Sequence, residues 1–240
     1  MLFRSTAASL AFADLAPDVR VAWQALNTCR GSSTSLVDSD CDGWKNNFEN
    51  VSNAIRPFTG THKSNFYSWL SQLPTRSGTP LPAAMDRVGR YYSTSGENSP
   101  YDSNLDPNDT NSGELACRRN YHVMMTDGIW NDAVSVAGNR DGTATNNTLP
   151  ETIDGISAYT PISPYSDNHT NTLADLAFYY WVRDLRGTMQ NNLLRSYRDS
   201  TGTDSQNFWN PRNNPATWQH MVNFRSEEHT SELQSQNRIS

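Results

Sequence analysis

Apolar side chains recur along this chain at two different spacings, separated by long polar stretches. In four segments they return every three to four residues, which places them on one face of an α-helix. These segments are Met1–Leu15, Ser64–Leu73, Leu81–Tyr92 and Thr172–Leu185. Pro80 suits the first turn of the third helix, and Thr172 or Asn171 can cap the fourth.

Three further segments have the patterns of β-strands. Val19–Leu26 begins with alternating apolar residues, Tyr121–Met125 is a continuous apolar run, and Trp218–Phe224 is the last strand. A continuous run is typical of a strand covered on both faces of a parallel sheet. Because strands alternate with helices, we expect an α/β fold with a mostly parallel sheet flanked by helices. Long polar loops interrupt it, and they are Thr94–Cys117, Ala133–Asn171 and Met189–Thr217.

Composition agrees with one large domain that carries long polar insertions. The chain has 240 residues, 35% of them hydrophobic, and seven Trp and ten Tyr argue against disorder. The net charge is −6 and no basic run occurs, so the phosphate-neutralising face of a nucleic-acid binder is missing. No apolar run approaches the ~20 residues of a membrane-spanning helix. The first residues superficially resemble a signal peptide, but their apolar part is short and broken, so we expect the chain to start inside a domain.

The last residues read differently from the rest of the chain. Residues 225–235, RSEEHTSELQS, are the translation of a common short-read sequencing adapter. We therefore expect residues 225–240 to be a disordered sequencing artefact, to be left out of fold reasoning like a cloning scar. The domain then covers residues 1–224, with its last strand cut off.

Two polar motifs fall where the predicted sheet would bind a ligand. In open α/β sheets, ligands bind at the carboxyl ends of the strands. Asp127 directly follows the strand Tyr121–Met125 and Thr126, and Thr79 precedes the helix Leu81–Tyr92. A carboxylate and a hydroxyl suit a hard cation such as Mg²⁺ or Ca²⁺. The alternative is that Asp127 forms a turn and Thr79 caps a helix; their joint order favours the metal site.

These motifs resemble those of a von Willebrand factor A domain, in SGTPL followed by MMTDGIWND. A longer series is more specific: FYSWLSQLP, GTPLPAAMDRVGRYYS, CRRNYHVMMTDGIWND, NTLADLAFYYWVRDLR and WQHMVNF. It resembles the N-terminal half of PilY-type proteins, the type IV pilus assembly factors and tip adhesins of Gram-negative bacteria. The resemblance spans most of residues 1–224, with diverging loops.

The resemblance implies a von Willebrand A-like (Rossmann-like) fold and a metal-ion-dependent adhesion site. Such a site takes an Asp-x-Ser-x-Ser loop, a Thr and an Asp; Thr79 and Asp127 match the last two. The first loop should follow a strand upstream of Met1–Leu15, which fits truncation at the N-terminus. We therefore expect the site to be incomplete and to hold Mg²⁺ or Ca²⁺ weakly or not at all. The β-propeller expected C-terminal to the A domain is also absent.

A second candidate metal site lies in the polar loop after Val19–Leu26. Its side chains fit the EF-hand calcium pattern at every defined position, in Asp38, Asp40, Asp42, Gly43 and Glu49. Against it, Lys45 stands where an apolar residue is usual, and the preceding residues are not helical. The alternative is an acidic solvated loop. A weak extracellular site of ~10⁻⁴–10⁻³ M affinity would still be filled outside a cell.

The three cysteines leave the pairing partly open. Cys29 and Cys41 flank a short polar loop and are a disulfide candidate if the protein is exported. Cys117 remains, either with a partner outside this chain or as a buried thiol. His122 alternates with apolar neighbours and is expected to be a core or sheet-face histidine. No Ser-His-Asp order, Gly-x-Ser-x-Gly elbow or zinc-spaced His pair occurs, so we expect no enzyme.

The leading hypothesis is therefore an exported type IV pilus biogenesis and tip adhesion module. We expect it at the cell surface, the pilus tip, or the outer membrane and periplasm of a Gram-negative bacterium. Its expected partners are pilus minor subunits, host or abiotic surface ligands, and the β-propeller of the parent protein. The alternative is a generic A-type module that recruits a partner to a secreted or membrane complex. A metal-assisted hydrolase is disfavoured, because no general base accompanies Asp127.

Overall fold

The computed structural model places two compact units in the chain, each with its own apolar core. It describes residues 2–26, 54–72, 79–96, 98–103, 113–126, 130, 134–135, 137–142, 147–163 and 165–227. The first unit consists of Met1–Thr79 and Ser95–Glu114, and the second of Pro80–Thr94 and Leu115–Ser240. The periodic apolar side chains of the sequence therefore belong to two separate cores.

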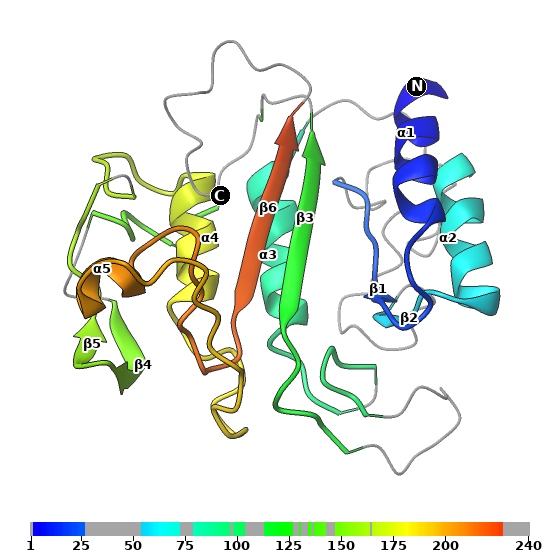
Figure 1. The fold of residues 1–240 in the computed structure, drawn as a ribbon. Helices are drawn as coiled ribbons and strands as arrows, with labels where there is room; N and C mark the ends of the chain where they lie inside the picture. Colours follow the sequence, from blue (N-terminus) through cyan, green and yellow to red (C-terminus); the bar gives the residue numbers. More distant parts are fainter. Residues whose placement is uncertain are drawn as a thin grey trace. The chain divides into compact units, whose positions relative to one another are not determined.

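The first unit is built on a pair of helices, α1 (Leu2–Ala13) and α2 (Gly60–Gln72), which pack on each other (Figure 1). Aromatic rings fill the space between them. The ring centroid of Phe66 lies 4.9 Å from that of Phe12 and 5.3 Å from that of Phe58. Such edge-on and tilted pairs add to the burial of the rings themselves. The helix predicted over Met1–Leu15 is confirmed, and the helix predicted over Ser64–Leu73 begins four residues earlier than expected.

The strand predicted over Val19–Leu26 is mostly wrong. Only β1 (Arg20–Val21) forms, and it pairs antiparallel with β2 (Arg56–Pro57). Pro57 has no N–H to donate, which limits the ladder that it can join. Trp23, which the alternating pattern placed on a sheet face, instead packs in the aromatic cluster, with its ring 5.4 Å from Phe66.

The second unit contains the predicted parallel strands. β3 (Asn120–Thr126) pairs in parallel with β6 (Met221–Glu227), in an unbroken register from Asn120↔Met221 to Thr126↔Glu227. The mixed α/β fold with a parallel strand pair is thus confirmed. β6 continues three residues beyond Phe224, the expected end of the domain. Backbone pairing places no demand on side-chain identity, and the origin of residues 225–240 stays a prediction.

The helices α3 (Leu81–Tyr91) and α4 (Leu173–Trp181) pack on each other, and α4 also packs on β6 (Figure 1). Alternate residues of β3 point to opposite faces. Met124 is 3% exposed, whereas Val123 and Met125 on the other face are 59% and 50% exposed. The prediction that this strand is covered on both faces is therefore wrong, because the apolar run has one open face.

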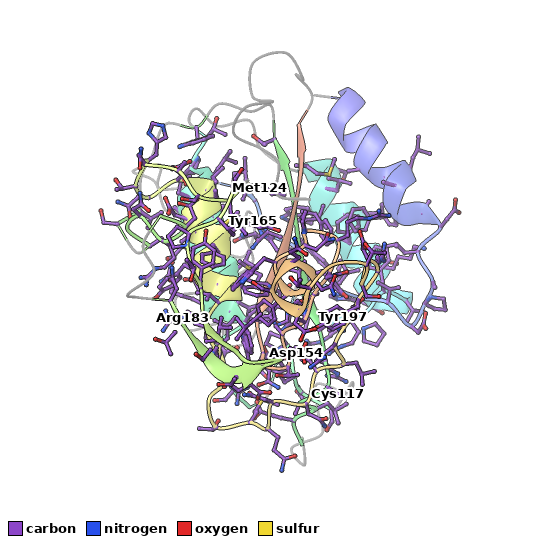
Figure 2. All side chains as sticks on the ribbon, turned by 60° about the vertical axis from the view of Figure 1, so that its left-hand side comes forward. Cys117, Met124, Asp154, Tyr165, Arg183 and Tyr197 are labelled. Carbon is purple, nitrogen blue, oxygen red and sulfur yellow. The ribbon has the colours of Figure 1, made fainter. Side chains whose placement is uncertain are left out.

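The polar stretch Ala133–Asn171 was expected to be a loop, and that prediction is wrong. It contains an antiparallel hairpin of β4 (Thr148–Ile153) and β5 (Ile156–Ala158). Asp154 and Gly155 form its two-residue turn with φ of 53° and 80°. Positive φ at both positions is typical of the type I′ turn, for which Asp-Gly is a preferred sequence. Arg195 and Tyr197 hold the Asp154 carboxylate, the Tyr197 hydroxyl at 2.8 Å (Figure 2).

Capping boxes start the remaining helices of this unit. The Thr172 hydroxyl caps α4, as predicted, and Thr203 caps the short α5 (Asp204–Phe208), which was not predicted. α4 ends at Trp181, before the expected Leu185, because the chain turns back: the Leu185 N–H donates to the Gln219 carbonyl at 2.8 Å. The core beneath these elements contains Leu149, Ile153, Val182, Phe208, Ala216 and Trp218.

Candidate functional site

The start of α3 and the end of β3 lie at the same edge of the parallel strand pair. The Tyr92 hydroxyl, at the C-terminal end of α3, donates a 2.8 Å hydrogen bond to the Tyr121 carbonyl at the N-terminal end of β3. The two elements run in opposite directions and have comparable lengths, about 16 Å for the helix and about 23 Å for the strand. Leu81 and Thr126 are therefore at the opposite, carboxyl edge (Figure 1).

This edge is where sequence reasoning expected the adhesion site. Thr79 is half-buried and stands two residues before α3. Asp127 directly follows β3 and lies outside the described residues. The structure thus confirms the strand and the helix that frame the site. The joint role of Thr79 and Asp127 as metal ligands stays a prediction.

The other predicted site residues also lie outside the described part of the chain. They are the calcium-loop residues Asp38, Asp40, Asp42 and Glu49 and the disulfide candidates Cys29 and Cys41. Within the described residues, no three His, Cys, Asp or Glu side chains form a group that could hold a metal ion. Cys117 is described, and it is an exposed free thiol rather than a buried one.

A cavity of about 430 Å³ opens between α3 and the end of α4. Its lining residues are Asp86, Arg90, Ser93, Tyr179, Tyr180, Arg183, Asp184 and Leu185. The Asp86 carboxylate accepts a 2.6 Å hydrogen bond from the Tyr180 hydroxyl and lies 3.0 Å from Arg90 Nε. Burial, and then the carboxylate beside it, raise the pKa of the Tyr180 hydroxyl. The acidic and basic side chains here are balanced, so the cavity favours neither sign of ligand charge.

A polar network around Asp175 was missed by sequence reasoning. Asp175 Oδ2 accepts from the Thr172 N–H at 3.0 Å and from its hydroxyl at 2.9 Å. The other carboxylate oxygen accepts from the Arg140 N–H at 2.5 Å. One carboxylate therefore caps α4 and also holds the loop of residues 137–142. The capping-box spacing of Thr172 and Asp175 was readable, but the attachment of the loop was not.

Asp141 lies in that loop and is the most perturbed carboxyl group of the network. The residue is only 2% exposed. Burial, followed by the negative charges of Asp175 and Asp167, raises its pKa to about 6. An ionised carboxylate is unfavourable in this position, because it is removed from water beside like charges.

The described histidines in the strand region are structural. His122 Nδ1 lies 2.9 Å from Asn223 Oδ1 across the strand pair, so the expected sheet-face role is confirmed. His220 is buried, with Nδ1 2.7 Å from the Trp218 carbonyl and Nε2 2.9 Å from the Asn214 side-chain nitrogen. This arrangement fits a neutral ring that donates from Nδ1 and accepts at Nε2. Burial lowers the pKa of His220 to about 4.

Comparison with known proteins shows which proteins this chain is similar to. The chain is 43% identical over 225 residues to the "Type IV pilus biogenesis factor PilY1" of Pseudomonas aeruginosa strain UCBPP-PA14. The predicted resemblance to PilY-type proteins is confirmed. The PilY1 proteins of strains PAK and PAO1 match at 42% and 41% identity. These alignments cover 93% of this chain but only 17 to 18% of the PilY1 proteins.

The chain thus spans less than a fifth of the length of the curated relatives it matches. No family model matches it, and no solved structure matches it. The von Willebrand A-like fold therefore stays a prediction, and the structure shows the coarser feature of a parallel strand pair with helices. Within the described residues, no helix is long and apolar enough to cross a membrane.

Proposed function

We propose that this chain is a segment of an exported type IV pilus biogenesis factor of a Gram-negative bacterium. The observation that carries the proposal is the identity of 41 to 43% with PilY1 along 93% of the chain. An alignment of this length includes the parallel strand pair and both helices packed with it, so it reflects more than one shared motif. The segment acts as a binding module within the larger protein and not as an enzyme.

Its binding site is the carboxyl edge of the strand pair. Thr79 and Asp127 supply two ligands of a divalent ion there, and a loop from outside this chain supplies the others. A carboxylate of the bound partner completes the ion's coordination. Support comes from the placement of the α3 start and the β3 end at one edge, since oxygen ligands at such an edge suit Mg²⁺ or Ca²⁺. The proposed partners are pilus minor subunits and surface ligands.

An exchange of segments tests the role of this edge. Residues 1–224 replace the aligned stretch of Pseudomonas aeruginosa PilY1 in a strain that lacks PilY1, so that the preceding PilY1 residues are retained. Attachment of the cells to a surface is measured with calcium and magnesium present and after chelation. The exchanged protein should support attachment that chelation reduces.

Variants of the exchanged protein separate assembly from adhesion. Asp127→Ala and Thr79→Ala should keep surface pili and lose the chelation-sensitive part of attachment. Val123→Ala, on the exposed face of β3, is the matched control and should change neither readout. Equal chelation-sensitive attachment by Asp127→Ala and the unsubstituted exchange would show that the edge does not bind through a metal ion.

A further inference from the structure

Three aspartates of the second unit converge from separate parts of the chain. Asp141 lies in the loop of residues 137–142, Asp167 in the segment before α4, and Asp175 in the first turn of α4. The Asp167 N–H approaches Asp141 Oδ1 at 3.5 Å, and the Asp141 N–H approaches Asp175 Oδ1 at 3.4 Å. This group is separate from every site residue that sequence reasoning proposed.

The three carboxylates differ in how their oxygens are used. Both oxygens of Asp175 accept hydrogen bonds from the cap and from the loop. One oxygen of Asp167 accepts from the His169 N–H at 2.7 Å. Asp141 Oδ2 is buried and has no hydrogen-bond partner in the part of the chain that the structure describes. A buried carboxylate oxygen without a donor is strongly unfavourable unless a proton or a cation satisfies it.

No basic side chain fills that role in the described structure. Arg140 is the neighbouring cation, but its Nε donates to the Ala137 carbonyl at 3.1 Å. Its guanidinium carbon also lies 5.2 Å from the centroid of the Tyr179 ring. The ion pairs of this unit include Asp86–Arg90 and Asp154–Arg195. Neither involves the three aspartates.

The loop brings two neutral oxygens close to Gly142, which directly follows Asp141. A Cβ added to Gly142 would lie 2.6 Å from the Asp167 carbonyl oxygen and 2.2 Å from Asn139 Oδ1. Only glycine therefore allows this approach of the loop to residue 167. The Asn139 amide nitrogen donates to the Asp167 carbonyl at 3.2 Å, which fixes the two segments together. The Asp167 carbonyl oxygen and the Asn139 amide oxygen therefore lie beside Gly142, the residue that follows Asp141.

These features suit calcium better than magnesium. No three acidic side chains of the described residues could hold a metal by themselves, so an ion needs neutral oxygens as well. Ca²⁺ takes six to eight oxygens in a flexible arrangement, commonly with backbone carbonyls, amide oxygens and waters, whereas Mg²⁺ demands a near-ideal octahedron. Asp167 is half-exposed, which leaves the ion a route from solvent.

We propose that Asp141 and Asp167, with neutral oxygens of the loop of residues 137–142, bind one Ca²⁺ ion in the second unit. The ion satisfies Asp141 Oδ2 and joins the loop to the segment that leads into α4. The site is structural and does not depend on the proposed pilus function. It also differs from the edge site at Thr79 and Asp127 and from the loop of Asp38–Glu49.

Calcium titration of the purified chain tests the proposal. The chain is freed of metal with a chelator, returned to chelator-free buffer at neutral pH, and titrated with calcium chloride by calorimetry. Terbium, which replaces calcium, gives a second readout through emission sensitised by a nearby tyrosine. Tyr159 can serve as that tyrosine, because the negative charge of Asp141 contributes to raising the pKa of its hydroxyl. Asp127→Ala and Asp40→Ala are controls for the two other candidate sites.

The expected result is one Ca²⁺ bound per chain with a dissociation constant at or below about 1 mM. Asp141→Asn should weaken binding at least tenfold and abolish the rise in melting temperature with calcium, while both controls keep them. Should Asp141→Asn fail to fold in chelator, Asp167→Asn replaces it, since Asp167 is half-exposed. Equal calcium binding by the parent and a folded variant, or no binding by the parent at about 10 mM calcium, would overturn the proposal.

Discussion

Substitution of Gly89 by alanine probes the packing that sets the position of α3. Gly89 lies in α3 directly against the ring of Tyr180 in α4. A Cβ at this position would come within 2.3 Å of Tyr180 Cε1 and Cζ. No flexible end of a side chain can yield here, because the contact is with the ring itself, whose hydroxyl is hydrogen-bonded to Asp86.

The size of the effect follows from three opposing contributions. Alanine gains up to about 1 kcal/mol over glycine in helix propensity. Overpacking costs about 1–3 kcal/mol, and rotation of Tyr180 away from Asp86 loses a hydrogen bond to a charged group, worth about 1.5–3 kcal/mol. We therefore expect Gly89→Ala to lower the free energy of unfolding by about 2–5 kcal/mol.

Urea denaturation followed by circular dichroism measures this change, and a second background isolates its cause. In Tyr180→Ala the ring is gone, so adding Gly89→Ala should be neutral or stabilising by up to about 1 kcal/mol. An equal cost of Gly89→Ala in both backgrounds would refute the ring contact. No cost in the parent background would refute the packing of α3 on α4.

Three further predictions concern single side chains. Met124→Ala should destabilise the chain by about 2–5 kcal/mol in urea denaturation, because its side chain is buried. Met125→Ala, on the exposed face of β3, should cost less than about 1 kcal/mol. Similar costs for the two variants would contradict the assignment of the buried and exposed faces. Asp175→Ala should cost about 2–4 kcal/mol, because the N–H groups of Thr172 and Arg140 lose the carboxylate that accepts their hydrogen bonds. The exposed Asp204→Ala should cost below about 1 kcal/mol in the same urea denaturation. His220 is neutral when folded and has its pKa lowered from 6.5 to about 4, so its contribution to stability is lost as the pH falls from 6.5 towards 4. That loss is at most about 3 kcal/mol, and it should vanish from the pH profile of His220→Gln; parallel profiles of parent and variant would contradict it.

Local patterns were enough to predict the elements that frame the edge. The apolar run Tyr121–Met125 and the periodicity of Leu81–Tyr92 each give a strand or helix with boundaries within one residue of the structure. The Asp154-Gly155 turn carried an equally local signal that was overlooked in a polar stretch. These patterns could not predict which face of β3 is buried, because burial depends on elements far away in the sequence.

The group of Asp141, Asp167 and Asp175 was also beyond what local sequence patterns can predict. Thr172 and Asp175 have the spacing of a capping box, which any reading of the helix start could find. Asp141 lies in the polar stretch Ala133–Asn171, for which the sequence predicted only a loop. Its perturbed pKa arises only when folding brings residues 141, 167 and 175 together. The shortening of the strand at Arg20–Val21 likewise depends on its pairing with Pro57, 37 positions from Arg20 in the observed register (57 − 20).

The most direct test of the pilus assignment is the amount of pilin on the cell surface. Surface pilin sheared from cells is quantified in a Pseudomonas aeruginosa strain without PilY1, with and without PilY1 in which residues 1–224 replace the aligned stretch. We expect the exchanged protein to restore surface pilin, and the same protein with the core substitution Trp218→Ala to restore little, since Trp218 is fully buried. An exchanged protein that is exported and stable but leaves surface pilin at the level of the strain without PilY1 would contradict the assignment.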